Sequence, residues 1–587
     1  MRLPSLFALV ALVAACGGAP SPETAPSPAV AGGARAAVIR GTRSIPATWT
    51  VHSSPVTAPK AMVVSAHPLA SAAGIEVIKQ GGNAIDAAVA VGFALAVVLP
   101  DAGNIGGGGF IVHRSAAGEV QAIDYREMAP GGASHDMYLD SAGNVTEKSL
   151  TGHLASGVPG SVAGMYEAWK RQGSLPWATL LAPAIRLARD GHRVDAERSG
   201  DIAGDADRLV HFPASKQQFL PGGHPPPPGT LWKQPDLART LQLISDSGPD
   251  VFYRGQIADL IVAEMQRGGG LITKDDLRRY RPKWRTPVQL SYRGYTIYSM
   301  PPASSGGVTM GEILNIMEGY DTLPAFGSAA YVHLLAESMR RAFMDRNHWL
   351  GDPDFVSMPL ERLLSKSYAA ELRGQIDPRR ATPTPPQPAG GGEGMHTTHY
   401  SIVDTAGNAA SVTTTLNGGF GSAVTVTGAG FLLNNEMDDF AAAPGKPNMY
   451  GLVQGEANAI EPGKRMLSAM TPSIVLDRDG QLSMVVGTPG GPTIITTVTQ
   501  VILDVLDQGM TLAEAVAAPR IHHQALPDVI RYERGGLSDA AVTALRAMGH
   551  QVEMRRGTSG IVAAIQRTPA GWVGVPDPRY AGGAVGW

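Results

Sequence analysis

A proline- and glycine-rich linker runs directly into a threonine-led segment with the alternation of a β-strand. Residues 381–394 carry four prolines and a glycine run, a composition that disfavours helix and sheet. Shortly after this linker, Thr397, Thr398 and Tyr400 begin the strand pattern. We predict a self-cleavage site between His396 and Thr397, where the linker meets the strand.

The chemistry of such a cleavage needs only the threonine. Its hydroxyl attacks the preceding carbonyl, the amide shifts to an ester, and water opens the ester. Thr397 is then left with a free α-amine, whose reference pKa of about 7.7 to 8.0 lets it take the hydroxyl proton near neutral pH. Thr-Thr pairs also open ordinary strands, so the interpretation depends on the residues downstream of Thr397.

The segment after Thr397 predicts a sheet. Strand patterns cover residues 398–403, 410–416, 430–433, 471–476 and 482–486. A short turn at residues 405–408 should pair the first two strands antiparallel about residue 406. That register places Thr415 opposite Thr397, which predicts a second hydroxyl beside the proposed nucleophile.

Two adjacent glycines, Gly490 and Gly491, connect a strand pattern to a helical pattern. Backbone N–H groups at such a junction suit an anionic oxygen, either a phosphate or the oxyanion of an acyl intermediate. The lysine of a phosphate-binding loop is missing, which favours the oxyanion, although a plain tight turn also fits.

Charged residues mark a candidate substrate site. Arg126 follows a glycine run and a predicted strand, and its forked guanidinium suits a carboxylate. The acidic segment that includes Glu436 and Asp439 suits an ammonium group. An ordinary ion pair and a solvated turn remain alternative interpretations.

Other chemistries have little support in the sequence. The pair His522-His523 lacks a third ligand at a familiar spacing, so no metal is expected. Residues 304–307 lack the serine-hydrolase elbow. The net charge of -3, without a basic run, gives no reason to expect a nucleic-acid partner.

The amino terminus has the pattern of an export signal. Residues 1–15 form the signal, and the only cysteine, Cys16, stands where a bacterial lipoprotein is lipidated, although a plain signal cut nearby also fits. Residues 16–57, rich in Ala and Pro, read as a disordered tether. We therefore expect an exported, periplasmic or cell-envelope protein that contacts the membrane only through a lipid at Cys16.

The rest of the chain reads as a globular scaffold. Its composition, 44% hydrophobic and 17% charged, is ordinary for a folded protein of 587 residues. Residues 83–99 predict a buried helix that is capped by Asn83 and ended by Pro100. Residues 160–380 are mostly helical, with a strand near residues 293–300.

These pieces together resemble the γ-glutamyltranspeptidase family of N-terminal-nucleophile hydrolases, from about Ala61 to residues 576–579. The markers are Gly81-Gly82-Asn83-Ala84, residues 103–110 (GNIGGGGF), 125–130 (YREMAP), 397–401 (TTHYS) and 434–440 (NNEMDDF), and Gly490-Gly491. The resemblance implies an α+β fold, a four-layer αββα sandwich. It also implies a heterodimer of a large subunit, 58–396, and a small catalytic subunit, 397–587, cut from one precursor.

The resemblance also implies residue roles. Thr397 is the nucleophile, Thr415 positions it, and Tyr450 covers the pocket as a lid. The remaining roles are Arg126 and Ser468 for the α-carboxylate, Asn417, Glu436 and Asp439 for the α-amine, and Gly490 and Gly491 for the oxyanion. The expected reaction transfers a γ-glutamyl group from glutathione or a related compound to water or to an amino-acid or peptide acceptor, without a cofactor.

One departure from the family pattern bears on the substrate. The family commonly has two adjacent serines where this chain has Ser468 and Ala469, and a hydrogen bond to a charged group is worth about 1.5 to 3 kcal/mol. We expect weaker binding of the α-carboxylate, which keeps a cephalosporin (glutaryl) acylase as the alternative. His396 and Pro492 are smaller departures. A non-catalytic peptide-binding lipoprotein is the rival from another class.

Overall fold

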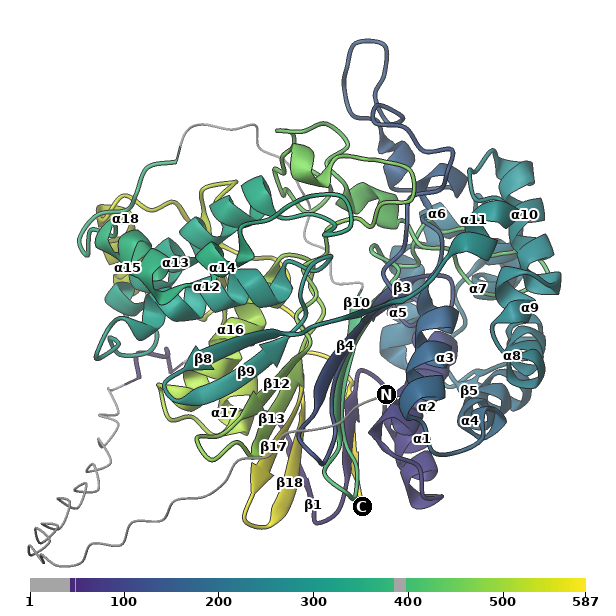
Figure 1. The fold of residues 1–587 in the computed structure, drawn as a ribbon, viewed down its shortest axis with the longest axis horizontal. Helices are drawn as coiled ribbons and strands as arrows, with labels where there is room; N and C mark the ends of the chain where they lie inside the picture. Colours follow the sequence, from purple (N-terminus) through teal and green to yellow (C-terminus); the bar gives the residue numbers. More distant parts are fainter. Residues whose placement is uncertain (1–42, 48, 385–396) are drawn as a thin grey trace, which may run out of the picture. The chain divides into compact units, whose positions relative to one another are not determined.

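Two antiparallel seven-stranded sheets form the centre of the computed structural model, which describes residues 43–47, 49–384 and 397–587 (Figure 1). The first sheet runs, in spatial order, β1 (Val56–Ala58), β18 (Gly571–Pro576), β17 (Ala563–Thr568), β13 (Leu482–Gly487), β12 (Ser473–Leu476), β9 (Tyr295–Ser299) and β8 (Val288–Tyr292). The second runs β19 (Gly583–Gly586), β2 (Met62–Ser65), β10 (Thr397–Val403), β11 (Ala409–Thr415), β3 (Gly108–Arg114), β4 (Val120–Asp124) and β7 (Lys283–Arg285).

The two sheets stack through an apolar layer to which both contribute. Val64 and Val112 of the second sheet belong to the same buried cluster as Val485 and Ile565 of the first. Helices cover the outer faces: α1 (Pro68–Lys79), α2 (Ala84–Val98) and α3 (Ser161–Gln172) on the second sheet, and α12 (Gly306–Glu318), α13 (Ala329–Trp349) and α16 (Thr493–Leu506) on the first. The predicted αββα sandwich is confirmed.

Further helices and strands lie outside these four layers or at their edges. The remaining helices are α4 (Trp177–Asp190), α5 (Ala196–Gly204), α6 (Ala206–Leu209), α7 (Pro213–Phe219), α8 (Pro235–Ser247), α9 (Asp250–Tyr253), α10 (Gln256–Gly268), α11 (Lys274–Arg279), α14 (Leu360–Leu363), α15 (Lys366–Gly374), α17 (Leu512–Ala517) and α18 (Asp539–Ala547). The small strands are β5 (His192–Arg193), β6 (Leu231–Trp232), β14 (Ile521–His522), β15 (Ile530–Tyr532) and β16 (Val552–Met554). No helix in these described ranges has the length and apolarity that crossing a bilayer requires.

Helix α2 supports the second sheet from behind. Asn83 caps it as predicted, since its Oδ1 accepts the N–H groups of Ile85 and Asp86, and all residues of the helix are buried. A Cβ on Gly92 would lie 2.8 Å from the hydroxyl oxygen of Tyr400 in β10. The missing side chain therefore lets the helix lie directly on the strand that begins with Thr397.

A polar chain crosses the apolar layer between the sheets. The Nδ1 of His399 lies 2.8 Å from Thr413 Oγ1, its Nε2 lies 3.1 Å from Ser401 Oγ, and that hydroxyl donates to Ala563 O in the other sheet at 2.8 Å. Burial lowers the pKa of His399 to about 3, so the imidazole is neutral. These hydrogen bonds fix β10 relative to β11 and to β17 of the opposite sheet.

Most predicted strands are confirmed, with small shifts at their ends. The prediction of a strand at residues 430–433 is wrong. Leu432 makes only an isolated bridge to Thr425, and Gly430 turns the chain with a φ of 74°. The apolar residues that suggested a strand, Phe431 and Leu433, instead pack into the helical layer.

The tether predicted for residues 16–57 requires a correction at its end. Trp49 and Ser53 pack on α17, where Trp49 Nε1 donates to Ala517 O at 3.1 Å and Ser53 Oγ to Ala513 O at 2.6 Å, and Val56 already belongs to strand β1. Packing therefore starts before Ala58. The signal, Cys16 and His396 lie outside the described residues.

A glycine-to-alanine change in β13 tests the packing around His399. A Cβ on Gly487 would overlap the imidazole ring, so we expect Gly487→Ala to cost about 1 to 3 kcal/mol by overpacking, measured as a lower midpoint of thermal unfolding. Gly374→Ala, at the end of α15 where nothing lies within 4 Å, is the matched control and should leave the midpoint unchanged or higher. Equal effects of the two changes would contradict this role of Gly487.

Candidate active site

Two threonine hydroxyls meet at the start of the central hairpin. The register of β10 and β11 pairs Thr397 with Thr415, as predicted, and their Oγ1 atoms lie 3.1 Å apart. Thr415 Oγ1 also accepts the N–H of Asn417 at 2.8 Å, which leaves its own proton free for the oxygen of Thr397. The register therefore brings two hydroxyl groups together at the first residue of the strand.

The glycine pair forms the predicted turn between β13 and α16. Gly490 and Gly491 have positive φ values of 133° and 55°, a backbone that favours glycine, and helix α16 begins after Pro492. Within the described part of the chain, neither glycine N–H donates to a protein acceptor. Both donors are therefore available for a ligand oxygen.

A buried arginine gathers three carboxylates beside the hairpin. Arg126 Nη1 lies 2.6 Å from Glu436 Oε2 and 3.5 Å from Glu127 Oε2, while Nη2 binds Asp439. Burial opposes the charge of Arg126, but these carboxylates raise its pKa. Burial in turn raises the pKa of Glu127 and Glu436, and Arg126 opposes that shift.

Tyr450 lines the same cavity as Arg126 and Asp439. Its hydroxyl donates toward Asn417, whose backbone O and Oδ1 both lie at 2.9 Å, and its ring lies against Gly491. Gln524 Nε2 donates to Tyr450 O at 3.1 Å and holds the backbone of this residue. The cavity measures about 20 Å³.

The cavity brings together most of the predicted site. The predicted residues that line it are Arg126, Thr397, Thr415, Asn417, Asp439, Tyr450, Ser468 and Gly491, and Ala469 lines it beside Ser468. Glu436 reaches the site through its ion pair with Arg126, and Gly490 precedes Gly491 in the turn.

A second arginine in the cavity wall was missed by the sequence analysis. Arg346 of α13 is fully buried, its Nε donates to Ser305 Oγ at 2.9 Å and its Nη1 to Asn347 Oδ1 at 2.9 Å. Burial lowers its pKa to about 10, and Asp439 opposes that shift. No local pattern singled it out, because α13 carries two other arginines.

Ser305, from the segment 304–307 that lacks the serine-hydrolase motif, supports the site from outside the cavity. Ser305 donates through its N–H at 2.8 Å and its Oγ at 2.6 Å to the carbonyl of Ser468. The backbone of Ser468 is thereby fixed next to Arg126, whose Nε donates to Met466 O at 3.2 Å.

The histidine pair has protein partners. The Nδ1 of His522 lies 2.9 Å from Thr496 Oγ1, and the Nε2 of His523 lies 3.1 Å from Asp528 Oδ1. Elsewhere His333, Glu337 and His550 come close enough to share an ion, but His333 and His550 hydrogen-bond each other at 2.7 Å. Glu337 binds Arg341 at 2.7 Å, so these groups are already satisfied.

Sequence comparisons agree with this geometry. The family model described as "Gamma-glutamyltranspeptidase" matches residues 70–587. The chain is 47% identical over 532 residues to the glutathione hydrolase proenzyme of Escherichia coli (strain K12), covering 89% of this chain and 91% of the relative. It is 40% identical over 535 residues to the acylase ACY 1 proenzyme of Pseudomonas sp. (strain SE83), covering 89% and 93%.

Solved structures with a similar fold include an acylase and a γ-glutamyltranspeptidase. The cephalosporin acylase from Bacillus halodurans superimposes with a TM-score of 0.81 at 29% identity, covering 92% of this chain and 98% of that one. The γ-glutamyltranspeptidase of Helicobacter pylori gives a TM-score of 0.54 at 46% identity, covering 57% and 95%. From its sequence and its fold, this chain belongs to the γ-glutamyltranspeptidase family.

Proposed function

We propose that this protein is a self-cleaving γ-glutamyl acyltransferase and hydrolase that acts on glutathione or related γ-glutamyl compounds. The observation that carries the proposal is the meeting of Thr397 and Thr415, 3.1 Å apart, with the free N–H of Gly491 in one cavity. Its relatives named glutathione hydrolase proenzyme support the same activity.

The first step is maturation. Thr397 Oγ1 attacks the carbonyl carbon of His396, the C–N bond breaks, and water hydrolyses the resulting ester. This cut separates the small subunit, 397–587, from the polypeptide that contains the large subunit, 58–396, and the two form a heterodimer. The new α-amine of Thr397 then serves as the base for its own hydroxyl.

The second step is acyl transfer. Thr397 Oγ1 attacks the γ-amide carbon of the donor, its proton passes to the α-amine, and the N–H groups of Gly490 and Gly491 stabilise the oxyanion. The amine product leaves with that proton. Water or an amino-acid acceptor then attacks the γ-glutamyl ester and restores the threonine, a sequence that gives ping-pong kinetics.

The charges of the cavity suit a zwitterionic head group. Arg126 and Ser468 line the cavity and would bind a carboxylate, and Arg346 adds a second cation to the lining. Burial raises the pKa of Glu436 and Asp439, so an ammonium group held by these carboxylates and Asn417 would offset the cost of their charge. A γ-glutamyl group supplies both charges.

The glutaryl acylase alternative rests on Ala469, which lines the cavity without a hydrogen-bonding side chain. A glutaryl group keeps the carboxylate and lacks only the amine. Ala469 therefore weakens the binding of both donors alike. Glu436 and Asp439 discriminate between the donors, because only the γ-glutamyl group has the amine that they would bind. The charge pattern thus favours the γ-glutamyl donor over the glutaryl donor that the sequence analysis connected with Ala469.

Export and lipid anchoring at Cys16 complete the proposal. Their support is the pattern of residues 1–16, and the anchor would hold the enzyme at the cell envelope. A non-catalytic peptide-binding lipoprotein remains the rival class, and it would stay a single chain.

Replacement of the nucleophile tests maturation. We expect wild-type protein to separate into two chains on a denaturing gel, with an intact mass that places the cut before Thr397, and Thr397→Ala to stay whole. Thr398→Val is the matched control, because the Oγ1 of Thr398 is buried without a partner among the residues that the structure describes, and it should still be cut. A single chain for wild-type protein under folding conditions would leave the binding-protein class standing.

Donor discrimination tests the head-group assignment. We expect kcat/KM for γ-glutamyl-p-nitroanilide to exceed that for the glutaryl analogue by about 10- to 100-fold, the value of one hydrogen bond to a charged group. Asp439→Asn should reduce this ratio, whereas Ala469→Ser should raise kcat/KM for both donors by a similar factor. A higher rate with the glutaryl donor would favour the acylase.

A further inference from the structure

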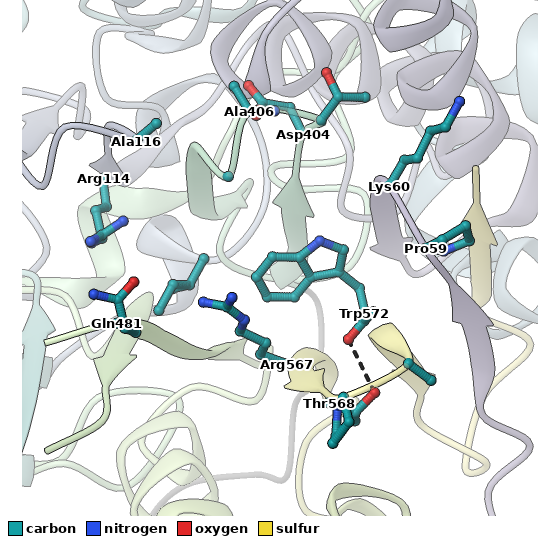
Figure 2. A pocket seen from close by; sticks show the side chains of 16 residues that line it. Pro59, Lys60, Arg114, Ala116, Asp404, Ala406, Gln481, Arg567, Thr568 and Trp572 are labelled. Carbon is teal, nitrogen blue, oxygen red and sulfur yellow. Dashed lines mark hydrogen bonds between the residues drawn. The ribbon is translucent and has the colours of Figure 1, made fainter. Parts of the chain in front are cut away.

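A second cavity of about 640 Å³ lies at the other end of the sandwich from Thr397 (Figure 2). It is lined by the turn after β10 at residues 404–407, the turn between β17 and β18 at residues 568–571, and the end of β3 at Arg114. Strand β10 rises about 3.3 Å per residue, so this cavity lies roughly 20 Å from the nucleophile. It is a separate place in the fold, and its ligand chemistry is independent of the proposed function.

Three cations line this cavity without an acidic partner among the described residues. Arg114 is only 8% exposed, and it donates at long range to Ser115 O at 3.3 Å and to Gly480 O at 3.5 Å, while its Nε has no acceptor. The side chain of Arg567 makes no hydrogen bond or ion pair within the described chain. Lys60 only rests over the ring of Trp587, at 4.6 Å.

The one carboxylate in the lining does not neutralise these cations. Asp404 Oδ1 accepts the N–H groups of Ala406 and Asn408, both at 2.9 Å. Its Oδ2 accepts the N–H of Ala84 at 2.8 Å and Asn408 Nδ2 at 2.6 Å. Asp404 therefore serves the turn and the start of α2, and the cavity keeps an unbalanced positive charge.

An aromatic wall accompanies the charge. The half-buried indole of Trp572 lies in the middle of the cavity, next to Arg567, in the view of Figure 2. Its turn is fixed by Thr568 Oγ1, which donates to Gly571 O at 3.1 Å. A flat ring that stacks on the indole can place an anionic group on the neighbouring guanidinium groups.

We propose that this cavity binds a small aromatic anion, whose ring stacks on Trp572 and whose anionic groups bind Arg567 and Arg114. Its volume falls within the roughly 300 to 1,000 Å³ of small-molecule sites and exceeds what a single inorganic anion would fill. The site gives the protein a ligand-binding function apart from acyl transfer.

Calorimetric titration with naphthalene-1,5-disulfonate tests the proposal, on the full protein at low ionic strength. We expect saturable binding of one probe per chain, at least tenfold weaker in Arg567→Gln and in Arg114→Gln. Arg478→Gln is the matched control: it removes the same charge from the neighbouring turn, where Arg478 Nε donates to Arg293 O at 3.2 Å outside the cavity. Its affinity should equal that of wild type.

Two further measurements distinguish the contribution of the aromatic ring to binding from the contribution of the anionic groups. Trp572→Leu should weaken binding of the naphthalene probe and leave any binding of methanedisulfonate unchanged, while neutral naphthalene-1,5-diol should not bind. Chain cleavage and γ-glutamyl turnover report that each variant folds. Absence of saturable binding, equal weakening in Arg478→Gln, or equally tight binding of the diol would overturn the proposal.

Discussion

The antiparallel pairing of β10 with β11 is the constraint on which the site depends. It sets the two threonine hydroxyls at 3.1 Å and places the start of β10 beside the glycine turn that follows β13. The pairing is itself held from two sides. Helix α2 lies on Tyr400 because Gly92 has no side chain, and the polar chain through His399 ties β10 to the opposite sheet. A strand anchored on both faces can hold its first residue in one position.

Around this rigid strand, charge defines the binding pocket. Arg126 and Arg346 come from different layers and are both buried at the cavity, where Asp439 interacts with each of them. Buried charges are costly unless they are paired, and Arg126 is paired with Glu436 and Asp439. Under the proposed function, a ligand with both charges would replace these internal ion pairs with its own, and selectivity would follow from how many of the pairs it replaces.

The predictions from sequence succeeded where a local pattern carried the information. The turn at residues 405–408 sets the register of its own hairpin, and Asn83 specifies the start of its own helix. Arg346 escaped notice, and Ser305 was considered only for a hydrolase motif, because both act through segments distant in the chain, at Asp439 and Ser468. The strand prediction for residues 430–433 failed because an apolar run is compatible with a strand and with a buried loop equally well.

The order of strands in the two sheets has a consequence for a chain that is cut before Thr397. In one sheet β10 and β11 would belong to the small polypeptide and lie between β2 and β3 of the large one, while in the other β18 to β12 would lie between β1 and β9. The two polypeptides would thus be interleaved, with neither owning a complete sheet. Separating the two polypeptides would require breaking the strand pairing in both sheets. The cut would therefore change the chemistry of Thr397, while the folded structure would keep the two polypeptides together.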